Sequence, residues 1–125
     1  MDEMKPRAYV AVLGDLVDSR VAPHRADLHR RLLDALARAN AGPGILDPFR
    51  VTAGDEFQGV FATPGDALAA SYRVRLTLGP TAARFGLGIG GIQVLDPDAN
   101  VQDGSAWWAA RHAIDAHGLE RVAVV

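Results

Sequence analysis

The feature that most constrains the fold is a turn sequence, Gly54-Asp55, set between two strand-like apolar runs. The run Phe-Arg-Val-Thr-Ala precedes the turn, and Phe-Gln-Gly-Val-Phe follows it after one glutamate. Glycine followed by aspartate between such runs is a signal for a tight two-residue hairpin, because glycine supplies the positive φ that a type II′ turn needs. The pattern predicts a hairpin over residues 49–62 with Asp55 and Glu56 at its tip.

A second acidic segment follows the first apolar run of the chain. Residues 8–13, Ala-Tyr-Val-Ala-Val-Leu, form a short continuous apolar stretch that ends at Gly14. Such a stretch is typical of a central strand that is buried on both faces. Asp15 follows at once, and residues 15–22 are polar and predict an irregular loop.

Helical periodicity and capping signals predict three helices, over residues 24–40, 63–78 and 104–117. The first has a polar face that includes Arg25, and the third has a small apolar stripe. The residues expected on the two buried faces are Leu28, Leu32, Leu33, Leu36 and Ala39 in the first helix, and Ala106, Trp107, Ala110, Ala113 and Ile114 in the third.

The remaining strands complete a recognisable order. Residues 84–94 alternate around glycines and predict a strand that another backbone or a ligand can approach closely. Residues 96–100 predict a loop, and residues 121–125 a last strand. The first six elements then follow the βαββαβ plan of an α+β, ferredoxin-like domain, with an α-β extension after it. The whole chain, residues 1–125, is expected to form this one domain.

The ferredoxin-like plan brings the two acidic segments together. Its sheet is antiparallel with the strand order 4-1-3-2 and carries both helices on one face. The end of the first strand, at Asp15, therefore faces the start of the third strand, at Asp55 and Glu56. Carboxylates gathered in one place repel each other unless a cation offsets their charge. Mg²⁺ takes oxygen ligands, often one or two carboxylates together with phosphates.

The candidate metal ligands are therefore the carboxylates of Asp15, Asp55 and Glu56, with the Leu16 carbonyl and Asp18 as further ligands. The alternative is that the aspartates are ordinary turn residues that form local hydrogen bonds. Arg20, Arg84 and the backbone at Gly54 are candidates for binding a phosphate ligand, although such arginines are more often surface pairing residues.

Arg111 and the adjacent tryptophans lie on the third predicted helix. Arg111 could project toward the acidic site, toward a partner subunit or into solvent. Because Trp107 and Trp108 are neighbours, they point to different faces, so one is expected in the core and the other at a dimer contact or over a base.

Composition excludes several classes of function. The net charge of −2 argues against direct nucleic-acid binding, which needs a basic face. The chain has no cysteine, so disulfides and thiolate metal sites are excluded. The four histidines lack zinc-ligand spacing. No apolar run is long enough to span a membrane, and residues 1–7 do not resemble a signal peptide. These features predict a cytoplasmic protein with no membrane partner.

Several segments together resemble the SatD family of bacterial proteins. They are YVAVLGDLVDSR at residues 9–20, GDEFQG at residues 54–59, RFGLGIG at residues 84–90, and the pairs Asp103-Gly104 and Ala110-Arg111. The resemblance covers nearly the whole chain. Members of that family are often longer, with a C-terminal segment that resembles a helix-turn-helix, and these 125 residues do not include such a segment.

More distantly, the pattern is similar to class III nucleotidyl cyclases and GGDEF diguanylate cyclases. The resemblance implies a nucleotide ligand, Mg²⁺ or Mn²⁺ ions held by Asp15, Asp55 and Glu56, and a backbone ligand at Leu16. It also implies a homodimer in which Arg111 stabilises the transition state across the interface. Three positions depart from those families: Ala53 replaces a glycine, Val51 a purine-selecting lysine, and Trp107 an asparagine. Both an enzyme of nucleotidyl transfer and a non-catalytic regulatory or dimerisation module remain open.

Overall fold

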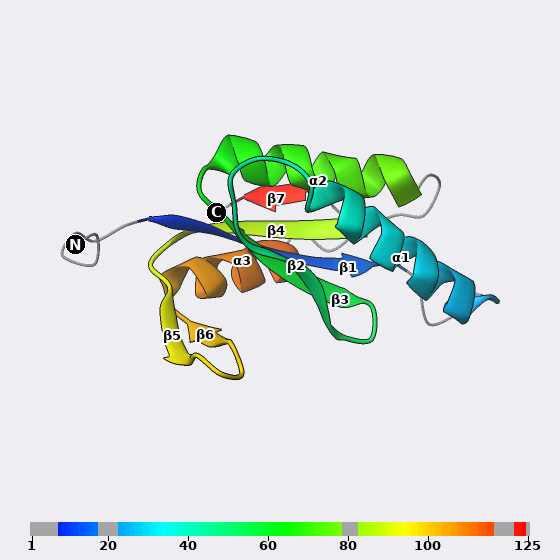
Figure 1. Ribbon diagram of the computed structural model, residues 1–125. Coiled ribbons are helices and arrows are strands. Elements are labelled where there is room, and N and C mark those ends of the chain that lie inside the picture. Colours follow the sequence, from blue (N-terminus) through cyan, green and yellow to red (C-terminus); the bar gives the residue numbers. More distant parts are fainter. Residues whose placement is uncertain (1–7, 18–22, 79–82, 117–121, 125) are drawn as a thin grey trace.

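The computed structural model describes residues 8–17, 23–78, 83–116 and 122–124 (Figure 1). Its helices and strands are, in chain order, β1 (Tyr9–Leu16), α1 (Arg25–Ala39), β2 (Ile45–Ala53), β3 (Glu56–Phe61), α2 (Pro64–Leu78), β4 (Ala83–Gly90), β5 (Gln93–Asp96), β6 (Val101–Asp103), α3 (Ser105–Ala116) and β7 (Val122–Val124).

The central sheet has five strands in the order β2-β3-β1-β4-β7. β1 pairs antiparallel with both β3 and β4, whereas β7 pairs parallel with β4. The first four strands therefore have the predicted order 4-1-3-2, and the predicted α+β class is confirmed. β7 forms within the segment predicted as the last strand and extends the sheet beside β4.

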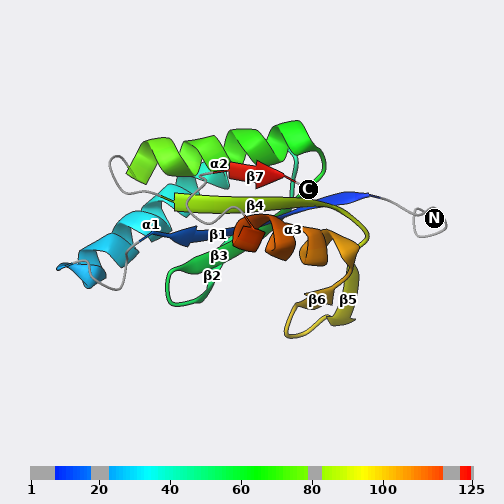
Figure 2. The same cartoon turned by 180° about the vertical axis from the view of Figure 1, so that it is seen from behind.

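The helices lie in two layers on opposite faces of the sheet. α1 and α2 cover one face, and α3 covers the other (Figure 1; Figure 2 shows the reverse side). Alternate residues of β1 serve the two layers: Val10 and Val12 pack in the larger core under α1 and α2, while Ala11 and Leu13 pack under α3. This division explains the continuous apolar run, because a strand covered on both faces has no solvent side.

Aromatic rings form the centre of the larger core. Phe57 is fully buried and packs edge-to-face against Phe49 and Phe85, with ring centroids 5.5 Å and 5.7 Å apart. Its ring also lies against the backbone of Gly14, where a Cβ atom would collide with it. β1 runs through Gly14 and Asp15 to Leu16, so the prediction of an irregular loop that begins at Asp15 is wrong.

The predicted hairpin is present, with β2 beginning earlier than expected, at Ile45. Ala53 is paired with Glu56, so Gly54 and Asp55 form a two-residue connection. Gly54 has a φ of 58°, in the left-handed region that the sequence predicted for this turn.

The glycine-rich segment differs from its prediction. It is not one strand over residues 84–94, because β4 ends at Gly90 and β5 pairs with β6 in a separate two-stranded sheet. The segment predicted as a loop is the turn of this second hairpin. A Cβ atom at Gly86 or Gly88 would collide with the backbone of α3. The close approach predicted for this strand is therefore made by a helix.

The second hairpin is attached to the body of the protein by polar side chains. The Oδ2 atom of Asp47 in β2 accepts hydrogen bonds from Asn100 at 3.1 Å and from Gln102 at 2.8 Å. The Oε1 atom of Gln102 in turn accepts a 3.2 Å hydrogen bond from the Trp107 indole nitrogen. These contacts join β2, β6 and α3.

The predicted buried face of α1 is correct at Leu32, Leu36 and Ala39. Leu33, however, is 46% exposed, so its assignment to this face is wrong. Successive helical residues are about 100° apart, which places Leu33 beside the buried stripe and not within it.

Candidate functional site

The acidic segments meet at the end of β1, as the strand order predicts. Gly14 lies opposite Phe57 of β3, so the next step of the same antiparallel register brings Asp15 beside Glu56. On its other side, Asp15 is paired with Arg84 of β4. These side chains share the face of the sheet that α3 covers, because they alternate with the residues of the larger core.

Asp15 and Arg84 form a two-point ion pair. The Arg84 Nε atom donates to Asp15 Oδ1 at 3.0 Å, and Arg84 Nη2 donates to Oδ2 at 2.6 Å. The side chains are partly buried, with 28% of Arg84 and 18% of Asp15 exposed. The hydrogen bonding that Arg84 donates to Asp15 raises the pKa of Arg84 above its usual value, and the charges of Asp15, Asp115 and Asp55 add to this effect, while burial opposes it.

Arg111 reaches the same region from α3. Its Nη2 atom donates to Glu56 Oε1 at 2.9 Å, and its Nη1 atom lies 3.9 Å from Asp115 Oδ1, one turn further along the helix. The contact with Glu56 is made within one chain. Asp115 was not among the predicted site residues, although its i, i+4 spacing from Arg111 on a predicted helix was a usable signal.

Asp55 connects this cluster to a neighbouring cavity. Its charge acts on Arg84, and its side chain also lines a cavity that includes Leu16. Leu16 is buried at the end of β1, next to Asp15 in the chain. Two further predicted residues, Asp18 and Arg20, lie outside the described residues.

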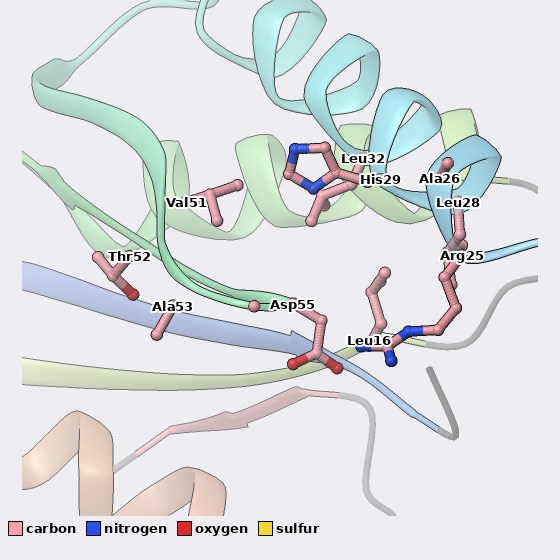
Figure 3. Close-up of a pocket in the computed structure, with 11 residues that line it drawn as sticks. Leu16, Arg25, Ala26, Leu28, His29, Leu32, Val51, Thr52, Ala53 and Asp55 are labelled. Carbon is pink, nitrogen blue, oxygen red and sulfur yellow. The ribbon is translucent and has the colours of Figure 1, made fainter. Parts of the chain in front are cut away.

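The cavity lies between the first half of α1 and the β2–β3 hairpin and has a volume of about 570 Å³ (Figure 3). Its wall is mostly apolar, with Arg25, His29, Thr52 and Asp55 as polar members. The other lining residues are Leu16, Ala26, Leu28, Leu32, Val51, Ala53 and Gly54. A pocket of this size with few polar groups is typical of small-molecule sites.

Two of the lining residues, Arg25 and His29, were not predicted to line a cavity. Arg25 was predicted on the polar face of the first helix and is exposed there, and it also lines the cavity. His29 had no ligand spacing in the sequence, yet it lies one turn after Arg25 on the same side of α1. Neither residue could be identified as a cavity residue from the sequence alone, because the hairpin that faces both is distant in sequence.

The charge and the ligand atoms at this edge of the sheet bear on whether it can bind a divalent cation. Asp15, Asp55, Glu56 and Asp115 face two guanidinium groups, so these six side chains keep two negative charges in excess. The charged donors are carboxylate oxygens, the ligand type that Mg²⁺ prefers. Within the described residues, no three acidic or histidine side chains are grouped as a ready metal site.

A carboxylate that binds an arginine with two hydrogen bonds still has free lone pairs, because its oxygens offer about four acceptor sites. The donor set therefore fits a divalent cation that is held by one or two carboxylates and completed by the phosphates of a ligand. Asp15 and Asp55 are the residues that would hold it.

A family model matches most of the chain. The model of the SatD family covers residues 9–120. The chain belongs to the SatD family. No curated protein matches the sequence of this family member at a significant level.

Solved structures show the same fold at low sequence identity. The adenylate/guanylate cyclase/hydrolase from Silicibacter pomeroyi is 23% identical, with a TM-score of 0.60 over 96% of this chain and 76% of that one. The EAL/GGDEF domain protein from M. capsulatus is 11% identical, with a TM-score of 0.62 over 94% and 84%. The adenylyl cyclase CyaB from P. aeruginosa is 14% identical, with a TM-score of 0.56 over 86% and 71%. The SatD chain therefore has a nucleotidyl cyclase-like fold.

Two of the positions that depart from the cyclase pattern have structural roles in this SatD chain. Trp107 is partly buried, packs against the core under α3 and donates a hydrogen bond to Gln102. Val51 packs against the larger core and lines the cavity. No helix in the described parts of the chain is both long and apolar enough to cross a membrane.

Proposed function

We propose that this SatD protein binds a nucleotide or another phosphate ligand together with Mg²⁺ or Mn²⁺ at the cyclase-like edge of its sheet. One observation carries the proposal: Asp15, Asp55 and Glu56 converge where β1 ends, beside a cavity of about 570 Å³. Because Asp55 belongs to both the acidic cluster and the cavity wall, one ligand can contact both regions.

The two regions suit different parts of such a ligand. The cavity offers apolar side chains and a few polar groups, which suits a ring system. Arg84 offers a planar guanidinium that can bind a phosphate with two hydrogen bonds, and Gly54 and Arg20 are further candidates for this contact. A bound divalent cation would neutralise phosphate charge and polarise a reacting oxygen. Asp15, Leu16, Asp18, Asp55 and Glu56 are the proposed ligands of that cation.

The binding proposal is tested by thermal unfolding with Mn²⁺ and ATP or GTP. A ligand that binds only the folded state raises the melting temperature, and a concentration about 100 times Kd adds about 2.7 kcal/mol of stability. With nucleotide present, we expect Mn²⁺ to raise the melting temperature of the wild-type protein and not that of Asp15→Asn. Asp98→Asn, in the exposed β5–β6 turn, is the control and should keep the increase. Wild-type protein that shows no shift with any common triphosphate would contradict the proposal.

Catalysis is a separate question, and two functions follow from the same site. In the first, Arg111 stabilises the charge that develops during nucleotidyl transfer. In the second, the domain binds the ligand without turnover and acts as a regulatory or dimerisation module. The second is favoured by Trp107, which is used for packing where class III cyclases have an asparagine. Incubation with labelled ATP and GTP distinguishes them: cyclic or linked nucleotide products indicate transfer, and unchanged nucleotide indicates binding alone.

We further propose that the protein forms a homodimer in the bacterial cytoplasm. The support is that three large apolar side chains on β5 and α3 are exposed: Val94 is 53% exposed, Leu95 61% and Trp108 64%. Exposed aromatic residues of this kind are enriched in protein interfaces.

A further inference from the structure

The Asp15–Arg84 pair joins two groups that the proposed function assigns to different partners. Asp15 is a proposed cation ligand, and Arg84 is a proposed phosphate ligand. In the structure both Asp15 oxygens accept hydrogen bonds from Arg84, at 3.0 Å and 2.6 Å. A cation on Asp15 and a phosphate on Arg84 would each compete with these two hydrogen bonds.

The chemistry of the two groups allows an exchange of partners. A guanidinium binds carboxylate and phosphate through the same two-point geometry. A carboxylate, in turn, is a normal ligand of a divalent cation. Each half of the pair therefore has an alternative partner of suitable charge in a metal–phosphate ligand.

Partial burial makes it unfavourable for either half to remain alone. Only 18% of Asp15 and 28% of Arg84 is exposed, and the loss of one partner leaves the other charge poorly solvated. A cation that took Asp15 alone would leave Arg84 without its partner, and a phosphate that took Arg84 alone would do the same to Asp15.

We propose that the Asp15–Arg84 pair couples cation binding to phosphate binding: Arg84 leaves Asp15 for a phosphate of the ligand when Asp15 accepts the cation. The coupling is reciprocal, because each ligand changes the affinity for the other by the same factor. This inference rests on the proposed function and adds the regulation of the same site.

The first test measures Mn²⁺ binding alone, without phosphate, from the electron paramagnetic resonance signal of free Mn²⁺. Arg84→Gln removes the guanidinium that competes for Asp15, so this variant should bind Mn²⁺ about tenfold more tightly than the wild type, given the usual strength of charge-assisted hydrogen bonds. If the wild type binds Mn²⁺ and Arg84→Gln binds it with equal or weaker affinity, the coupling is overturned.

The second test measures tripolyphosphate binding in the absence of metal by titration calorimetry in EDTA. Asp15→Asn removes the charge that holds Arg84, so this variant should bind tripolyphosphate about tenfold more tightly than the wild type. Arg84→Gln should bind it more weakly. An ion pair with only a structural role does not predict that tripolyphosphate affinity rises in Asp15→Asn and falls in Arg84→Gln. If the affinity is unchanged in both variants, the coupling is overturned.

Two further variants keep the tests interpretable. Arg84→Lys retains the charge but loses the two-point geometry, so its Mn²⁺ affinity should lie between those of the wild type and Arg84→Gln even if the latter folds poorly. Arg38→Gln breaks a 3.1 Å ion pair with Asp34 on the exposed face of α1 and should leave both affinities unchanged.

The tests also separate this inference from the proposed function. If the wild type binds Mn²⁺ and phosphate but neither affinity responds to Arg84→Gln or Asp15→Asn, the coupling is wrong and the binding site stands. If the wild type and all variants bind neither Mn²⁺ nor tripolyphosphate, the proposed function fails and the coupling fails with it.

Discussion

The position of Arg111 depends on how closely α3 packs against β4, and Gly88→Ala tests this contact. Gly88 lies in β4 under the first half of the helix. A Cβ atom at this position would collide with the Ala106 carbonyl oxygen and the Ala110 nitrogen, and it would lie 2.8 Å from the Ala109 Cβ atom. Two of these three atoms belong to the helix backbone, so a change of side-chain rotamer cannot relieve the collision. The helix itself must move away from the sheet.

The cost follows from the energetics of overpacking. Adding a carbon atom to a well-packed interior typically destabilises a protein by about 1–3 kcal/mol. For a domain of this size we expect a decrease in Tm of about 4–12 °C. Circular dichroism during heating, together with urea unfolding, measures both quantities. Because α3 carries Arg111, the same shift should also weaken its 2.9 Å contact with Glu56.

Gly65→Ala is the matched control for this substitution. Gly65 lies in the first turn of α2, and a Cβ atom there would meet only the Thr63 hydroxyl oxygen, at 3.9 Å. Alanine favours the helix over glycine by up to about 1 kcal/mol, so this variant should be as stable as the wild type or slightly more stable. If Gly88→Ala unfolds with the same midpoint and free energy as the wild type, the close packing of α3 on β4 is refuted.

Two further predictions concern the surface and the ion pair. Trp108→Ser should convert the proposed dimer to a monomer in light scattering, with unchanged circular dichroism, since the ring is exposed; a wild-type monomer at all concentrations would contradict the dimer. The pKa of Arg84 is raised, so the stabilising contribution of its charge is fully present below its ordinary pKa and is lost only as pH rises through the higher folded-state pKa. The difference in unfolding free energy between wild type and Arg84→Gln should therefore be equal at about pH 7 and about pH 10, and a smaller difference at about pH 10 would argue against the pair.

Local signals in the sequence were sufficient for the order of the first four strands. The glycine at the hairpin turn, the periodicity of the helices and the order of the elements predicted a ferredoxin-like sheet, and the order of its first four strands is confirmed. The same topology predicted that Asp15 would lie near Glu56, since antiparallel register relates positions that are far apart in the chain.

Errors arose where long-range packing overrides local pattern. The irregular loop was expected to begin at Asp15, but β1 continues to Leu16, paired with Arg84 and Ala83 of β4. The segment 84–94 alternated like one strand, yet it divides into β4 and β5 because β5 pairs with β6 in a second sheet. Neither pairing partner is visible in a local window of sequence.

The sequence by itself determined which strand ends carry acids and that the fold brings them to one edge. Only the tertiary structure decided the partners of those acids: Arg84 for Asp15, Arg111 for Glu56, and a cavity beside Asp55 that includes Arg25 and His29. The physical reason is that strand order follows from local propensity and connection rules, whereas ion pairs and cavities depend on side-chain positions set by the packing of both helical layers on the sheet.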